Sequence, residues 1–166
     1  MHRLFPHGNT IDRVVITGVG LLRIFFASIA PDKNNSTEHF PTSHHSHLQV
    51  SGLKVTFNND EENPRVESIK TACKIQKECS PITVRKWCQL NLSRNYTVAL
   101  PSEFIGKNGT GIAIFKGLIL DREVGDLDRE VFTNYIKECS PMTQMLDGRI
   151  VNHHIRNNLG WVKTNN

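Results

Sequence analysis

The segment "LDREVGDLDREVFTNYIKE" at residues 120–138 gives the clearest indication of secondary structure in this chain. Its apolar residues recur at steps of four, three, four and four positions, at Leu120, Val124, Leu127, Val131 and Tyr135. Side chains with this spacing share one face of an α-helix. Acidic residues fill the first half, where they suit the positive end of the helix dipole. We therefore predict an amphipathic helix whose acidic face points away from any polyanion.

Two more helices and one strand are predicted upstream of this segment. Val66, Ile69 and Cys73 approximate a helical stripe that begins near Arg65 and is stopped by Ser80 and Pro81. A second helix is expected to start at Ser80 and to bury Val84, Trp87 and Cys88. Residues 48–57 alternate apolar and polar side chains imperfectly, which favours a short strand. The predicted fold class is thus mainly α, a small helical domain with one or two short strands and a disordered N-terminal tail.

The segment "DGRIVNHHIRNNLGW" at residues 147–161 predicts a last helix, from Asp147 to Asn158. Val151, Ile155 and Leu159 recur every four residues and form its core stripe. A second stripe of potential nucleic-acid contacts lies beside it and comprises Arg149, His153, Arg156 and the bordering Asn157. Such residues can bind phosphates or base edges. A solvated polar face is the alternative interpretation.

The positive charges are clustered along the chain. The 166 residues carry a net charge of +4. Seven Lys or Arg and three Glu lie between Glu62 and Arg94, so this stretch alone accounts for that surplus. Clustering favours a face that binds an anionic partner over uniform solubilisation. The candidate contacts there are Lys70, Lys74, Lys77, Arg85 and Lys86.

The N-terminal third contains the most apolar run, "VVITGVGLLRIFFASIA" at residues 14–30. A signal peptide, a membrane anchor and a core segment all stay open for it, although the internal Arg23 and the following Pro31 argue against cleavage. Residues 31–47 are polar and read as a linker in which three histidines form no metal site. We therefore divide the chain into an N-terminal tail at 1–47 and a single globular domain at 48–166.

The cysteines and asparagines leave an alternative reading open. Cys73, Cys79, Cys88 and Cys139 form no CxxC pair, and we expect reduced thiols in a reducing compartment. Five Asn-x-Ser/Thr sequons also occur, at Asn34, Asn35, Asn91, Asn95 and Asn108. The alternative is therefore a secreted or type II membrane glycoprotein with disulfides.

Three segments of the C-terminal half share an order with a known family. "IGKNGTGIAI", then "LDREVFTNYI", then "MTQMLDGRIVNHHI" resembles the BEN domain of chromatin proteins, over residues of about 103–160. The resemblance implies an α-helical fold and DNA binding through the final helix, with Arg149, His153 and Arg156 as contacts. It also implies a nuclear role in transcription or chromatin. Residues 80–97 separately resemble a helix-turn-helix of insertion-sequence accessory proteins.

Catalytic signatures are weak in this sequence. The glycine-rich stretch "EFIGKNGTGIAI" at 103–114 lacks the GxxxxGK[ST] pattern, so it predicts a tight turn between apolar segments instead of a phosphate loop. No Ser-His-Asp or Cys-His cluster stands out. We expect no enzyme, no cofactor and no metal site.

The predicted function is a DNA-binding module in the nucleus. DNA is the expected partner, a homodimer stays open, and a membrane is not favoured. Besides the secreted glycoprotein, a small viral matrix-like structural protein is a further alternative, because residues 100–119 resemble rhabdovirus matrix proteins.

Overall fold

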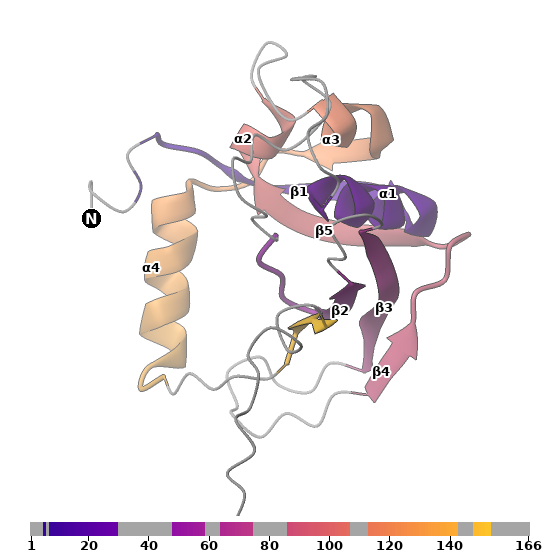
Figure 1. The fold of residues 1–166 in the computed structure, drawn as a ribbon. Coiled ribbons are helices and arrows are strands. Elements are labelled where there is room, and N and C mark those ends of the chain that lie inside the picture. The colour runs from indigo at the N-terminus through magenta and orange to yellow at the C-terminus, as the bar shows by residue number, and fades with distance from the viewer. Residues whose placement is uncertain are drawn as a thin grey trace, which may run out of the picture.

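The computed structural model describes residues 5, 7–29, 48–58, 64–74, 86–106, 113–142 and 148–153. Within these residues the chain forms seven strands and four helices, and the strands make two separate sheets (Figure 1). The prediction of a mainly helical domain is therefore wrong. The fold is of the mixed α/β class.

The first sheet has the strand order β5-β1-β6, and both pairings are antiparallel. It consists of β1 (Ile11–Thr17), β5 (Asn95–Pro101) and β6 (Ile119–Glu123). Val14 and Ile16 of the central strand are fully buried, whereas the intervening side chains are more exposed. This alternation is the period-2 pattern of a strand with one face on a core.

The second sheet has the order β4-β3-β2-β7. It consists of β2 (Leu53–Asn58), β3 (Arg65–Lys74), β4 (Lys86–Gln89) and β7 (Ile150–Asn152). The strand expected at 48–57 is confirmed by β2 over its C-terminal half. The helix expected from Arg65 is wrong, because that segment is β3. The predicted helix-turn-helix is likewise wrong within its described residues, since β4 and β5 occupy most of residues 86–97.

The predicted final helix is also contradicted, because residues 150–152 form β7, which pairs in parallel with β2. Parallel pairing between segments almost a hundred residues apart leaves no local signal in the sequence. The remainder of that expected helix, residues 154–158, lies outside the described residues.

Helix α1 (Gly18–Ile29) lies between the two sheets and contributes to both cores. Leu21, Ile24 and Ala27 pack in the core of the first sheet, while Phe25 and Ile29 pack with Val55 and Phe57 of the second. A helix buried on two sides is apolar on most of its circumference, which explains the apolar run. In the described part of the chain, no helix is long and apolar enough to cross a membrane.

Strand β1 and helix α1 belong to the packed body, although they lie within the segment that was predicted to be a tail. Residues 11–29 form the central strand of one sheet and the helix shared by both cores. The polarity of residues 31–47 suggested a boundary after residue 47, but the apolar run before these residues is part of the packed body. Residues 31–47 lie outside the described residues, and the division at residue 47 stays a prediction.

Three more helices complete the described fold: α2 (Ser102–Ile105), α3 (Ala113–Leu118) and α4 (Asp128–Cys139). The helix predicted at 120–138 is confirmed from Asp128 onward, whereas its first residues belong to β6. Helix α4 stands apart from the sheets in Figure 1. Its expected apolar stripe is consequently exposed to a large extent, with Val131 at 38% and Tyr135 at 46%.

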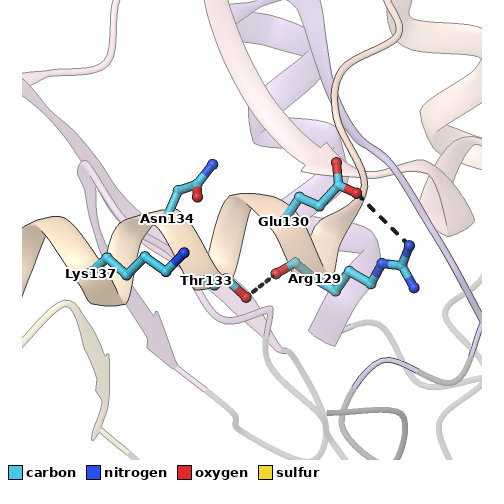
Figure 2. Close-up of a pocket in the computed structure, with 5 residues that line it drawn as sticks. All are labelled: Arg129, Glu130, Thr133, Asn134 and Lys137. Atoms are coloured by element: carbon cyan, nitrogen blue, oxygen red, sulfur yellow. Dashed lines mark hydrogen bonds and ion pairs between the residues drawn. The ribbon is translucent and has the colours of Figure 1, made fainter.

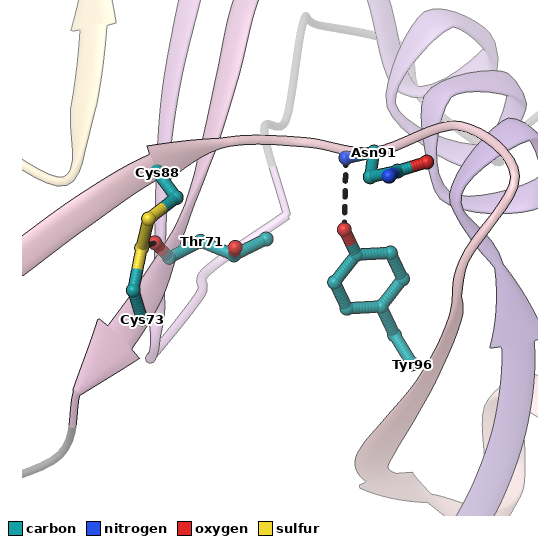
Figure 3. The surroundings of a disulfide bond; sticks show 5 residues. All are labelled: Thr71, Cys73, Cys88, Asn91 and Tyr96. Atoms are coloured by element: carbon teal, nitrogen blue, oxygen red, sulfur yellow. Dashed lines mark hydrogen bonds between the residues drawn. A yellow bond between two sulfur atoms is a disulfide. The ribbon is translucent and has the colours of Figure 1, made fainter.

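A disulfide joins Cys73 of β3 to Cys88 of β4, two neighbouring strands of the second sheet (Figure 3). Cys139 is disulfide-bonded as well. The expectation of reduced thiols is therefore wrong. Disulfides are typical of secreted proteins and rare in the nucleus.

Candidate functional site

The carboxylate of Asp12, which is fully buried on β1, makes several polar contacts. It accepts hydrogen bonds from Thr10 Oγ1 at 2.6 Å and from Arg122 Nε at 2.7 Å. The backbone N–H of Gly125 also donates to it, at 3.4 Å. Burial alone raises the pKa of Asp12, but these hydrogen bonds and the charge of Arg122 outweigh burial, so its pKa lies below the usual value.

Two backbone hydrogen bonds next to this ion pair hold the chain after β6 against the start of β1. The N–H of Ile11 donates to the carbonyl of Asp126 at 2.9 Å, and the N–H of Asp128 donates to the carbonyl of Asn9 at 2.8 Å. These bonds fix the point at which α4 begins. Asp12, which also accepts from the N–H of Gly125, therefore helps to position the start of α4, and its carboxylate is paired with Arg122.

Helix α2 is fixed to the same corner of the molecule. Ser102 Oγ accepts a hydrogen bond from the N–H of Thr10 at 3.0 Å, and the N–H of Ser102 donates to the carbonyl of Thr10 at 2.8 Å. Phe104 of α2 and Phe115 of α3 pack with their ring centroids 5.4 Å apart. The glycine-rich segment noted in the sequence connects these two helices. Residues 107–112 lie outside the described residues, so the predicted tight turn stays a prediction.

An open pocket of about 420 Å³ lies along α4. Its described lining consists of Arg129, Glu130, Thr133, Asn134 and Lys137 (Figure 2). Thr133 Oγ1 donates a hydrogen bond to the carbonyl of Arg129 at 2.6 Å, and the Arg129 guanidinium lies 3.8 Å from the Glu130 carboxylate. Beside the Glu130 carboxylate, Arg129, Lys137 and Asn134 offer two cations and an amide along one helix, which can bind an anion that also carries hydroxyl groups.

The residues predicted to bind DNA are distributed over the second sheet. Lys70 and Lys74 belong to β3 and Lys86 to β4, whereas His153 follows β7. Lys77, Arg85, Arg156 and Asn157 lie outside the described residues.

The two predicted contacts near β7 are engaged with the protein itself. Arg149 is half-buried, and its Nη1 donates a hydrogen bond to the carbonyl of Val50 at 2.9 Å. His153 Nδ1 lies 2.8 Å from the carboxylate of Glu67. The structure thus gives Arg149 a role in fixing β7 beside β2, where its own carbonyl also accepts from the N–H of Val55 at 2.7 Å.

Four residues of these sites were not predicted from the sequence: Asp12, Arg122, Arg129 and Lys137. A signal for Asp12 exists, because it is the one acidic residue within the alternating apolar strand "IDRVVIT". An acid on the buried face of a strand requires a partner. For Arg129 and Lys137 the sequence shows only a polar helix face. Among the described residues there is no group of three or more His, Cys, Asp or Glu that could hold a metal ion.

Comparison with known proteins decides the family. Residues 1–117 match the family model described as "5'-nucleotidase, C-terminal domain". The chain belongs to the 5'-nucleotidase C-terminal domain family. The resemblance to the BEN domain is therefore wrong, because it rested on short, degenerate motifs.

Related proteins support this assignment. A snake venom 5'-nucleotidase from Naja atra is 30% identical over 149 residues, which cover 89% of this chain and 25% of that protein. The human 5'-nucleotidase is 26% identical over 148 residues, or 89% of this chain and 23% of that protein. The 5'-nucleotidase precursor of Thermus thermophilus shares the fold with a TM-score of 0.64 at 24% identity, over 91% of this chain and 26% of that chain. The chain thus spans about a quarter of the length of these relatives.

These relatives contradict three functional expectations. Nothing among them supports DNA as a partner or a role in transcription. The expectation of no enzyme is contradicted, because the relatives of the chain include 5'-nucleotidases and an apyrase from Tabanus yao. The nuclear location is also wrong, since venom relatives and the disulfides support the secretory pathway. The viral matrix alternative has no support among them.

Proposed function

We propose that this chain is the nucleotide-binding portion of a secreted, nucleotide-hydrolysing enzyme. The observation that carries the proposal is the family match over residues 1–117, which extends from before β1 into α3. A 5'-nucleotide is the substrate class that the names of the relatives indicate. Hydrolysis itself is assigned to the whole protein, because the match to this chain covers only about a quarter of the length of the relative from Naja atra.

The α4 pocket suits one part of such a ligand. A 5'-nucleotide presents a phosphate of high negative charge beside ribose hydroxyl groups. Arg129 and Lys137 supply cations for phosphate oxygens, and Asn134 supplies an amide for a hydroxyl. We therefore assign the α4 pocket, defined by its five described lining residues, as the candidate phosphate contact.

The proposed location is the secretory pathway and the extracellular space. Relatives named for venom are products of secretion, and the Cys73–Cys88 disulfide fits an oxidising compartment. An extracellular nucleotidase meets nucleotides outside cells, so the ligand and the location agree.

Thermal unfolding with and without adenosine 5'-monophosphate tests the proposal. A ligand that binds only the folded chain at 100 times its Kd stabilises it by about 2.7 kcal/mol, which raises the Tm. We expect this shift in the wild type and a smaller one in the R129A/K137A double variant. The control K70A/K86A likewise removes two exposed cations, but from the second sheet, and should keep the full shift.

Two outcomes would contradict different parts of the proposal. If millimolar nucleotide leaves the Tm of the wild type unchanged, nucleotide binding by this chain is refuted. If the wild type responds and R129A/K137A responds equally, the α4 pocket is not the phosphate contact.

A further inference from the structure

The turn between β4 and β5 is held rigidly against the start of α1. The N–H of Asn91 donates to the Tyr96 hydroxyl at 2.8 Å (Figure 3). The N–H of Arg94 donates to the carbonyl of Asn91 at 3.2 Å. The carbonyl of Arg94 in turn accepts from the N–H of Gly18 at 2.8 Å. A Cβ on Gly18 would lie only 2.2 Å from the carbonyl oxygen of Asn91. The backbone of the turn is therefore inaccessible on its inner side.

The side chain of Asn91, in contrast, is exposed. Its Oδ1 accepts a hydrogen bond from the N–H of Ser93 at 3.0 Å, which forms an Asx turn. No contact shown for the described residues engages its Nδ2. Asn91, Leu92 and Ser93 form an Asn-x-Ser sequon, the acceptor sequence for N-linked glycans in secreted proteins.

We propose that Asn91 carries an N-linked glycan, an inference that rests on the secretory location within the proposed function. In the reaction, Nδ2 forms a bond to C1 of the first sugar of a lipid-linked pyrophosphate oligosaccharide. The bond between C1 and the phosphate oxygen breaks, Nδ2 loses one proton, and the lipid pyrophosphate leaves. The acceptor is used before folding, so the folded turn has only to accommodate the product.

The geometry of the turn accommodates that product at no cost in hydrogen bonds. Oδ1 can still accept from Ser93, because the sugar is attached to the other atom of the amide. Leu92, within the sequon, is 44% exposed. A glycan on Asn91 would shield this apolar side chain from other molecules, which gives the modification a solubilising effect.

The neighbouring sequon at Asn95 differs from that at Asn91 in its place in the fold. Asn95 is the first residue of β5 and pairs with Thr17 in the first sheet. Its side chain shares the outward face of that strand with Thr97 and Ala99. A sugar there would stand over the outer face of the sheet, whereas Asn91 lies in the turn outside both sheets. We therefore assign the glycan to Asn91.

Trypsin separates the two sequons, because it cleaves after Lys86, Arg94 and Lys107. The 166-residue chain would be secreted from mammalian cells behind a cleavable leader. Peptide N-glycosidase treatment in ¹⁸O-water, followed by reduction and trypsin, then converts each glycosylated Asn to labelled Asp. We expect the label in peptide 87–94 of the wild type, of the conservative variant S93T and of T97A, and its loss from that peptide in S93A.

The labelling of the tryptic peptides from the wild type decides the test alone, so a folding defect in S93A does not affect it. An unlabelled peptide 87–94 from secreted wild-type chain would overturn the proposal, as would a label confined to peptide 95–107. Nucleotide titration of the same preparation keeps the two proposals apart. Labelled Asn91 without nucleotide binding refutes only the proposed function, and the converse result refutes only the glycan.

Discussion

Replacing the buried Asp12 by Asn tests the Asp12–Arg122 ion pair at the junction of β1, β6 and α4. The wild-type carboxylate uses both oxygens, since Oδ1 accepts from Thr10 and Oδ2 accepts from Arg122. Asparagine offers one acceptor oxygen and one NH₂ group, so one of these donors would face another donor. The Arg122 cation would also lose its counter-charge.

The magnitude follows from burial. Losing a hydrogen bond to a charged group costs about 1.5–3 kcal/mol, and removing one partner of a buried pair costs about 3–5 kcal/mol. Asp12 is 0% exposed, but the side chain of Arg122 is 31% exposed and water can solvate it in the variant. We therefore expect D12N to lower the free energy of unfolding by about 3 kcal/mol, at the low end of that range.

Urea unfolding at pH 7 measures this change, and the neighbouring strand positions supply a matched control. Arg13 and Glu123 lie on the same two strands, with Nε and Oε2 2.7 Å apart, but their side chains are 57% and 64% exposed. Because exposed pairs contribute less than about 1 kcal/mol, E123Q should change stability little. Equal effects of D12N and E123Q, or a D12N effect below about 0.5 kcal/mol, would refute the assignment of Asp12 as the structural centre of this junction.

Further predictions concern pH, close packing and the disulfide. The pKa of Asp12 is lowered in the folded chain, so its contribution to stability is present above the unfolded value and is lost as pH falls through the folded value; acid titration of unfolding should therefore show a shallower loss of stability below about pH 4 in D12N than in wild type. G18A should destabilise the chain by about 1–3 kcal/mol in urea unfolding, because its Cβ would meet the Asn91 carbonyl. G117A, where a Cβ meets nothing within 4 Å, is its control and should be neutral or slightly stabilising. The variant C73S/C88S opens a loop with a sequence separation of 15, so the free energy of unfolding should fall by about 3 kcal/mol and the Tm should fall with it. An unchanged Tm would contradict the disulfide.

Local sequence patterns correctly predicted the elements in which the spacing of apolar residues matches one regular secondary structure. The second half of the helix at 120–138 and the strand at 53–57 were correct for this reason. The β3 strand was mistaken for a helix because of a bulge. Val66 pairs with Phe57 and Ser68 with Thr56, which leaves one extra residue on β3 between them. Val66 and Ile69 consequently contact the same core at a spacing of three residues, which imitates a helical period.

The candidate site was harder to predict from the sequence than the strands were. The buried role of Asp12 depends on Arg122, 110 residues away, and the parallel pairing of β7 depends on β2. The cations at Lys70, Lys86 and Arg149 suggested one binding face, but the folded chain engages Arg149 with Val50. Family membership required a comparison over most of the chain, because no short motif carries it.

Equilibrium dialysis of labelled adenosine 5'-monophosphate against the 166-residue chain tests the central claim most directly. We expect saturable binding of one nucleotide per chain, which unlabelled nucleotide displaces and which a DNA duplex at the same phosphate concentration does not. Equal nucleotide concentrations on both sides of the membrane at every protein concentration would contradict it.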